Sequence, residues 1–215
     1  MCGRFSLDTT KAKIAKEFKC DRVAFKGSSF NTAPSQNITT VVDAGDNNEA
    51  VLMRWGLIPH WVKSLDSWKS SLINARTETV EEKPSFRDSF KKRPCLVPVS
   101  GFYEWSKQKQ PYYFHTDKPL FALAGIWESW RDPQTDEQIL SCTILTTQAQ
   151  GNVTDIHYRM PVIVPAEYYD LWLGKLDGRK ELIDSLPEPE LQVYPVSKVV
   201  NSPQNDSFEC IESIE

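Results

Sequence analysis

The sequence predicts an α+β fold: one domain over residues 1–215, built on a mainly antiparallel, partly barrel-like sheet with flanking helices. Three observations support this class. A chain of 215 residues can bury one sizeable core. Short β-rich segments bounded by turn residues outnumber the helical segments. The two kinds of segment do not alternate regularly, which disfavours a parallel doubly wound sheet.

The expected elements follow in chain order. Residues 8–18 predict a helix because apolar side chains recur there at helical spacing, with Asp8 or Thr9 as the N-cap. The β-rich residues 38–43 and 50–55 flank a polar turn and predict a hairpin. Further strands are expected at 95–99, 101–106, 111–116, 120–128, 138–146, 191–196 and 208–212, and further helices at 84–92, 165–174 and 178–186.

Charge and hydropathy exclude some classes of protein. No apolar run approaches the roughly 18 residues that span a bilayer, and the N-terminus carries no apolar signal region. We therefore expect a cytoplasmic protein, nucleoid-associated if its source is bacterial, with no membrane partner. The net charge of −4 is unusual for a protein that coats duplex DNA. Any contact with nucleic acid must come from a local cluster of arginine and lysine.

The five cysteines form neither a metal pattern nor a disulfide pattern. Their number is odd, their spacings are long and no Cys-x-x-Cys pair occurs. The three histidines add no metal-ligand spacing. We therefore expect no metal and no cofactor. Most of the cysteines lie among apolar residues, as inert core thiols do, whereas Cys2 does not.

Cys2 would become the N-terminal residue once Met1 is removed, and its small side chain is compatible with that processing. It would then carry both a free α-amine, with a pKa of about 8, and a thiol, with a pKa of about 8.5. An aldehyde can form an imine with the amine, and the thiol can then add to give a thiazolidine. The alternative is that Cys2 is an accident of position, which is the more common case for a single cysteine.

Glu104 lies in the segment Gly101-Phe102-Tyr103-Glu104-Trp105. In a strand, Phe102 and Glu104 point to one face, and Tyr103 and Trp105 to the other. A carboxylate between bulky aromatic rings is partly desolvated, which raises its pKa and suits a general acid or base. The alternative is a glutamate on an edge strand that faces water.

Three other polar residues are candidates for a site. His157, next to an arginine and just before an expected strand, can shuttle protons, or it can be a structural hydrogen-bond partner. Asn74 could orient a carbonyl group, and Arg76 could bind an anion such as phosphate. The alternative for these two is a capped helix start with a surface ion pair. Trp61 and Trp68 place aromatic rings in a polar loop, and nucleic-acid bases stack on such rings.

Together these segments resemble the SOS response-associated peptidase (SRAP) family. The likeness extends over nearly the whole chain, and seven motifs in order make it specific. They are Cys2-Gly3-Arg4-Phe5, Asn31-Thr32-Ala33-Pro34, Arg54-Trp55-Gly56-Leu57-Ile58-Pro59, Asn74-Ala75-Arg76-Thr77-Glu78-Thr79, Gly101-Phe102-Tyr103-Glu104-Trp105, His157-Tyr158-Arg159-Met160-Pro161 and Val200-Asn201-Ser202-Pro203.

The resemblance implies a protein that shields damaged DNA. It would bind single-stranded DNA at an abasic site, as a monomer, and form a thiazolidine between Cys2 and the ring-opened sugar aldehyde. Glu104 would be the acid and base, His157 would position the sugar and assist proton transfer, and Asn74 would hydrogen-bond near the Cys2 amine. The resemblance also implies phosphate contacts from Arg4, Arg76 and Arg159, base packing by Pro34 and Trp61, and a site hydroxyl from Thr146.

One segment departs from the pattern of similar proteins, and two other functions remain open. The loop from Trp61 to Asn74 is long, and Val62 follows Trp61 where some members have a second tryptophan. One alternative function is a cysteine-type peptidase, whose minimal reaction would be removal of its own Met1, because a cysteine beside a histidine suits acyl transfer. The other is a non-covalent reader of modified DNA, which would not need Cys2.

Overall fold

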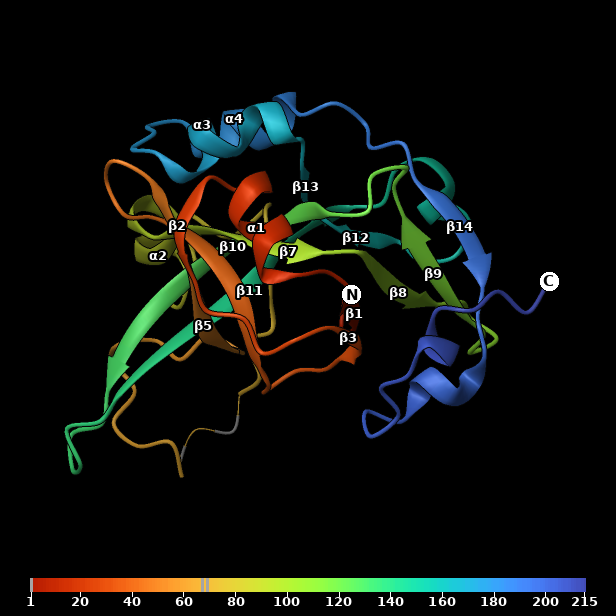
Figure 1. The fold of residues 1–215 in the computed structure, drawn as a ribbon. Helices are drawn as coiled ribbons and strands as arrows, with labels where there is room; N and C mark the ends of the chain where they lie inside the picture. The colour runs from red at the N-terminus through yellow and green to blue at the C-terminus, as the bar shows by residue number, and fades with distance from the viewer. Residues whose placement is uncertain (1, 67, 69) are drawn as a thin grey trace.

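Five strands close a small barrel in the computed structural model, which describes residues 2–66, 68 and 70–215 (Figure 1). Neighbouring strands are antiparallel except β5 and β11, which pair in parallel through Arg54–Ser141 and Trp55–Cys142 and so close the barrel. The predicted mainly antiparallel, partly barrel-like sheet is therefore confirmed. The barrel strands are β4 (Asn37–Asp43), β5 (Asn48–Trp55), β7 (Pro94–Val99), β10 (Phe121–Arg131) and β11 (Gln138–Gln148).

Strand β11 continues beyond the barrel and pairs with two short strands near its C-terminal end. The strand β6 pairs with it in parallel and β12 pairs with it antiparallel, so that Thr146 lies opposite Arg76 on one side and opposite Pro161 on the other. These pairings bring the motifs that begin at Asn74 and at His157 to either side of Thr146. The short strands attached to the barrel are β2 (Cys20–Val23), β6 (Asn74–Arg76), β12 (Arg159–Pro161) and β13 (Ile163–Val164).

A second sheet packs beside the barrel in the order β14-β9-β8-β1-β3. Only Ser100 separates β7 of the barrel from β8 of this sheet, and β1 also packs against β7. Phe5 of β1 lies opposite Phe102 of β8, so the chain start enters the molecule next to β8. The strands are β1 (Phe5–Leu7), β3 (Ser29–Thr32), β8 (Gly101–Trp105), β9 (Pro111–His115) and β14 (Gln192–Pro195).

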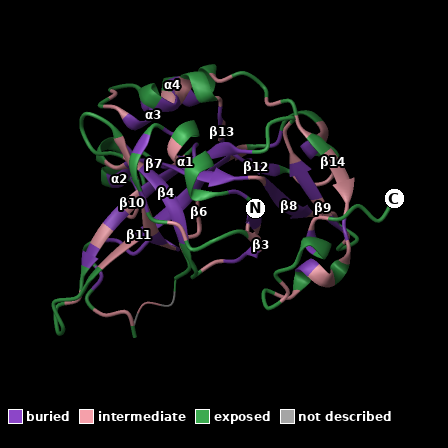
Figure 2. Ribbon diagram, viewed as in Figure 1, coloured by how far each residue is buried: buried purple, intermediate pink, exposed green. Residues whose placement is uncertain are grey.

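The helices are short and lie on the outside of the sheets (Figures 1 and 2). The first helix begins after Thr10, whose side chain accepts a hydrogen bond from the Lys13 amide at 3.3 Å. The predicted N-caps, Asp8 and Thr9, were therefore wrong by one or two residues. The helices are α1 (Lys11–Glu17), α2 (Arg87–Lys92), α3 (Tyr169–Leu173) and α4 (Arg179–Ser185), with 3₁₀ turns at η1 (Gly151–Asp155), η2 (Ala166–Tyr168), η3 (Lys198–Asn201) and η4 (Phe208–Cys210).

The C-terminal segment is not the strand that was predicted at 208–212. It forms the 3₁₀ turn η4, after which Ser213 makes an isolated antiparallel bridge with Val196, and side-chain hydrogen bonds hold the residues before it. The amide of Asn31 donates to the carbonyl groups of Val200, Ser202 and Asn205 at 2.6–3.1 Å. Side-chain hydrogen bonds of this kind compete with a sheet ladder for the same backbone groups.

The core fills the barrel and the space between the sheets. Figure 2 shows buried residues along the strands and exposed residues on the outer faces of the helices. Among the tryptophans, Trp55, Trp130 and Trp172 are fully buried, whereas Trp61 is 48% exposed. No helix among the described residues is long and apolar enough to cross a membrane.

Candidate active site

Cys2 lies inside the protein where the barrel meets the second sheet. Its side chain is fully buried. The Asn74 amide Nδ2 donates to the Cys2 carbonyl oxygen at 2.8 Å, and this contact ties the chain start to β6. Burial raises the pKa of the Cys2 thiol, and the nearby Glu104 adds to the rise. The thiol is therefore protonated at neutral pH and needs a base before it can act as a nucleophile.

Glu104 is a buried acid on β8. The strand is flanked by β1 and β9, so the alternative of an edge-strand glutamate facing water is wrong. The side-chain alternation is as predicted: Phe102 belongs to the main core, whereas Tyr103 packs in a separate cluster with Tyr113. Only 2% of Glu104 is exposed, and burial raises the pKa of its carboxyl to about 7. A group with this pKa can both donate and accept a proton at neutral pH.

His157 faces Glu104 from the segment that leads into β12. Its Nδ1 atom lies 3.8 Å from the Glu104 Oε2 atom. The backbone of Arg159 fixes the ring, with its carbonyl oxygen 2.9 Å and its amide nitrogen 3.1 Å from the same Nδ1 atom. Burial lowers the pKa of His157, so the imidazole is mainly neutral at neutral pH. The carboxyl and the imidazole therefore form an acid–base pair whose nearest atoms are slightly farther apart than a hydrogen bond.

The raised pKa of Glu104 predicts a pH-dependent stability. The folded protein binds this proton more tightly than the unfolded chain does, so the free energy of unfolding falls as the pH rises from 4.5 to about 7. We expect Glu104→Gln, which cannot ionise, to remove this fall and to be more stable than the wild type at pH 8 by up to about 3 kcal/mol. Urea unfolding at pH 5 and pH 8 measures the difference.

The control for this measurement is Glu82→Gln, which changes an exposed glutamate. We expect its free energy of unfolding to follow that of the wild type at both pH values. A Glu104→Gln protein that keeps the full wild-type fall would contradict the raised pKa of this carboxyl.

Thr146 and two arginines lie around the junction of β6, β11 and β12. Arg159 is 7% exposed, and its Nη2 atom donates to the Thr146 carbonyl oxygen at 2.6 Å and approaches the Thr146 hydroxyl at 3.3 Å. The same guanidinium forms a bidentate ion pair with Glu78, in the turn after β6. Arg76 is exposed at the end of β6. Because Asn74 and Arg76 are in a strand, the alternative of a capped helix start is wrong.

Arg4 is also held by protein groups. Its Nη1 atom donates to the Asn31 Oδ1 atom at 2.7 Å and to the Val200 carbonyl oxygen at 2.8 Å. Burial lowers the pKa of Arg4, which still leaves this guanidinium charged at neutral pH. Arg4 thus joins the chain start to the C-terminal segment, whatever other contacts it makes.

The loop after β5 presents an aromatic pair. Trp61 is exposed, and the ring of Trp68 packs against it edge-on with centroids 5.6 Å apart. Trp68 thus supports Trp61, although Val62 follows Trp61 in the sequence. Pro34, in the turn after β3, is partly exposed. Residues 67 and 69 of the loop lie outside the described residues.

Two ion-paired acidic residues carried no signal in the sequence. Glu128 of β10 is 5% exposed. Its Oε2 atom lies 3.3 Å from the His60 Nδ1 atom, in the aromatic loop, and 2.6 Å from the Arg93 Nη2 atom. Glu78 pairs with Arg159 as described above. A sequence shows none of these ion pairs because each joins residues at least 35 positions apart.

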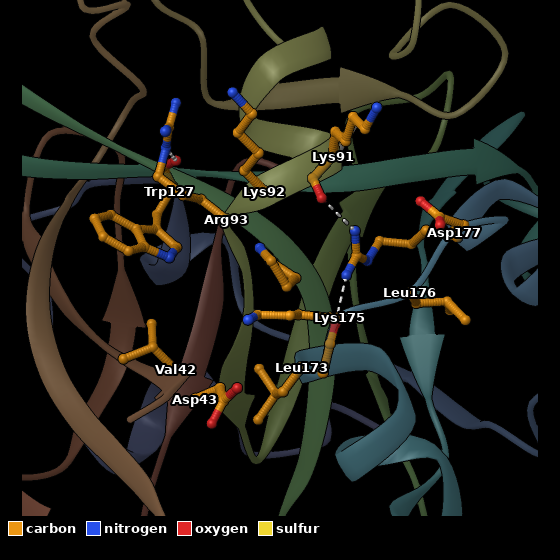
Figure 3. A pocket seen from close by; sticks show the side chains of 13 residues that line it. Val42, Asp43, Lys91, Lys92, Arg93, Trp127, Leu173, Lys175, Leu176 and Asp177 are labelled. Atoms are coloured by element: carbon orange, nitrogen blue, oxygen red, sulfur yellow. Dashed lines mark hydrogen bonds between the residues drawn. The ribbon is translucent and has the colours of Figure 1, made fainter. Parts of the chain in front are cut away.

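A well-formed hollow of about 430 Å³ lies elsewhere, between the end of β4, α2 and the loop after α3 (Figure 3). None of the candidate site residues lines it. Several cations border it, but the buried Arg179 donates to the carbonyl groups of Phe90, Lys91 and Gly174, and Arg93 is paired with Glu128. We therefore assign the candidate site to the surroundings of Cys2 and not to this hollow.

Among the residues that the structure describes, no group of three or more histidine, cysteine, aspartate or glutamate side chains could hold a metal ion. The chemistry that the described groups can supply themselves is nucleophilic attack by a cysteine, proton transfer by a carboxyl and an imidazole, and binding of anions by arginines.

The fold and the site define a class: an α+β protein with a closed barrel and a candidate cysteine nucleophile beside an acid–base pair. The chain belongs to the SOS response associated peptidase (SRAP) family, whose sequence pattern it matches over residues 1–203. The crystal structure of a Bacteroides thetaiotaomicron protein superposes on the whole chain with a TM-score of 0.88 and 26% sequence identity, and the chain covers all of that protein.

Two relatives show how widely the sequence pattern occurs. The abasic site processing protein YoqW of Bacillus subtilis (strain 168) is 40% identical to this chain over 99% of the chain and the full length of the relative. The abasic site processing protein HMCES of Pongo abelii is 31% identical over 87% of the chain, which corresponds to 65% of that longer relative.

Proposed function

We propose that this protein binds single-stranded DNA at abasic sites and captures the lesion as a covalent thiazolidine on Cys2 after Met1 has been removed. The adduct would shield the lesion during the response to DNA damage. One observation carries the proposal: Cys2 is held by Asn74 beside Glu104, a carboxyl whose pKa of about 7 suits proton transfer. The names of the relatives, abasic site processing proteins, support the same substrate.

The proposed reaction needs no oxidant, metal or cofactor. The Cys2 α-amine adds to the aldehyde carbon of the ring-opened sugar and gives a carbinolamine. This intermediate loses its hydroxyl group as water and becomes an imine. The Cys2 sulfur then adds to the imine carbon while the thiol proton is transferred to nitrogen, which closes the ring. The net reaction joins one aldehyde and one cysteine with release of one water molecule.

Each polar group of the site has a role in these steps. Protonated Glu104 donates a proton to the departing hydroxyl group, and its carboxylate form accepts a proton from the nucleophile. His157, neutral at neutral pH and 3.8 Å from Glu104, would exchange protons with it once the two groups move into hydrogen-bond distance in the substrate complex. Asn74 fixes the Cys2 carbonyl and thereby orients the amine. The thiol, whose pKa burial raises, can deliver its own proton as the ring closes.

Removal of Met1 is required by this chemistry. While Met1 is present, the Cys2 nitrogen belongs to a peptide bond and its lone pair is delocalised into the carbonyl group. Such a nitrogen cannot form an imine, and the thiol alone would give only a reversible hemithioacetal. We therefore propose that processing of Met1, by the protein itself or by an aminopeptidase, activates the site.

The DNA strand would be held by local contacts because the protein as a whole is acidic. Arg76, Arg159 and Arg4 are the proposed phosphate contacts, and Pro34 and Trp61 the proposed contacts to the flanking bases. The exposure of Trp61 and its support by Trp68 fit a stacking role. Thr146 would act through its contacts with Arg159.

The phosphate role of Arg76 predicts a change in salt dependence. We expect Arg76→Ala to weaken reversible binding to single-stranded DNA and to make the slope of log K against log salt shallower by about 0.7, the value for one lost phosphate contact. Fluorescence anisotropy across a salt series measures the slope. Lys175→Ala, in the hollow that we did not assign to the site, removes the same charge and should leave the slope unchanged. Equal slopes for wild type and Arg76→Ala would mean that Arg76 binds no phosphate.

The proposed function is tested by incubating the processed protein with a single strand that carries an abasic site and running a denaturing gel. We expect an adduct that survives heating, and none with the same strand lacking the lesion. Reversible binding without an adduct would favour a non-covalent reader. Loss of Met1 from the purified protein without any adduct, dependent on Glu104 and His157, would favour the peptidase.

A further inference from the structure

Glu78 pairs with one arginine near the site, Arg159, and follows another, Arg76, by two residues. It follows β6 in a turn, and its two carboxylate oxygens pair with the two terminal nitrogens of Arg159, the second of them at 3.0 Å. The hydrogen bonds from Arg159 lower the pKa of the Glu78 carboxyl, and the positive charge of Arg76 lowers it further. One carboxylate thus compensates the charge of both arginines.

The two partners of this ion pair differ in their exposure to solvent. The side chain of Arg159 is 8% exposed, whereas that of Glu78 is 49% exposed. The buried guanidinium needs an anion, because a buried charge without a partner is costly. The Glu78 carboxylate, in contrast, is half exposed, so water can solvate it when it leaves the guanidinium. The pair can therefore open on the Glu78 side if another anion takes the place of the carboxylate.

A phosphate group has the right shape to take that place. Carboxylate and phosphate both offer two oxygens to the planar fork of a guanidinium group, and arginine binds either one in a bidentate manner. The carbonyl oxygen of Thr146, 2.6 Å from the Arg159 Nη2 atom, would hold the guanidinium in position during the exchange. Arg76, exposed at the end of β6, lies close enough to contribute to the same anion site.

We propose that Glu78 is a placeholder for a DNA phosphate: it occupies the Arg159 guanidinium in the free protein and is displaced when a strand brings a phosphate to Arg159 and Arg76. The inference rests on the proposed function for its ligand. Displacing the Glu78 carboxylate takes up part of the free energy of DNA binding. A strand whose backbone does not reach both arginines gains too little to offset this cost and therefore binds more weakly. Glu78 is thus a specificity-determining residue that never touches the reacting atoms.

The test is reversible binding of an intact single-stranded oligonucleotide, which needs no reaction at Cys2. We expect Glu78→Gln to bind about five- to tenfold more tightly than the wild type, because a like charge beside the phosphate is removed. We also expect a slope of log K against log salt that is steeper by about 0.7, since Arg159 now neutralises a phosphate without a competing carboxylate. A purely structural ion pair would change affinity downward or not at all.

Two variants keep the test decisive. Glu82→Gln removes the same charge from an exposed position four residues away and should bind like the wild type. Glu78→Asp keeps the charge but shortens the side chain, so it should fold even if Glu78→Gln does not and should still bind more tightly than the wild type. Binding by the wild type with no gain in either Glu78 variant would overturn the placeholder. Absence of binding by every protein would overturn the proposed function itself.

Discussion

Cys2→Ala is expected to form no heat-stable adduct with an abasic single strand. The substitution removes the sulfur that closes the ring, and the α-amine that remains can give only an imine. An imine is hydrolysed in water, so no adduct should remain on a denaturing gel unless a reductant traps it. The replacement is small and the side chain is fully buried, so we expect the protein to stay folded.

The matched control for this experiment is Cys95→Ala. Cys95 is as deeply buried as Cys2 but lies on β7, and its carbonyl oxygen accepts a hydrogen bond from the Trp172 indole. This variant should form the adduct at the wild-type level. An adduct of full strength from Cys2→Ala would contradict the thiazolidine mechanism and assign the nucleophile to another side chain.

Glu104→Gln is expected to slow adduct formation by about 10²-fold or more, the effect of losing a general acid and base. The amide keeps the shape of the side chain and removes its titratable proton. The wild-type rate should also fall as the pH rises above about 7, where Glu104 loses that proton, and the variant should lack this fall. Single-turnover rates across a pH series measure both effects.

His157→Ala provides the comparison. Because His157 acts through Glu104 in the proposed chemistry, its loss should slow adduct formation less than Glu104→Gln does, and should also slow reversal. Wild-type rates in Glu104→Gln at every pH would remove this carboxyl from the mechanism.

The longer elements of the fold could be predicted from the sequence because their signals are local. The helix α1 and strands such as β4 and β8 lie within a few residues of their predicted bounds. The short strands β1, β3 and β6 were missed because three or four residues carry no readable alternation. The parallel closure between β5 and β11 joins distant parts of the chain, and the predicted barrel-like sheet did not specify this pairing.

In the candidate site, too, only features with a local signal in the sequence could be predicted. A desolvated Glu104 was predictable because its aromatic neighbours are adjacent in sequence. The burial of Cys2 was not predictable, because chain termini are usually exposed. Here Asn74, which is distant in sequence, holds the residue inside the protein. Glu78 was passed over because an acid is an unexpected member of an anion-binding cluster, and only the structure pairs it with Arg159.

The Cys2 α-amine that Met1 removal frees is the group that attacks the aldehyde, and the intact mass of the heat-stable adduct tests this directly. We expect the mass of the protein without Met1, plus that of the abasic strand, minus one water molecule. Peptide mapping should then place the attachment on Cys2. An adduct whose mass still includes Met1 would contradict the account, because its Cys2 nitrogen would be an amide that cannot form the imine.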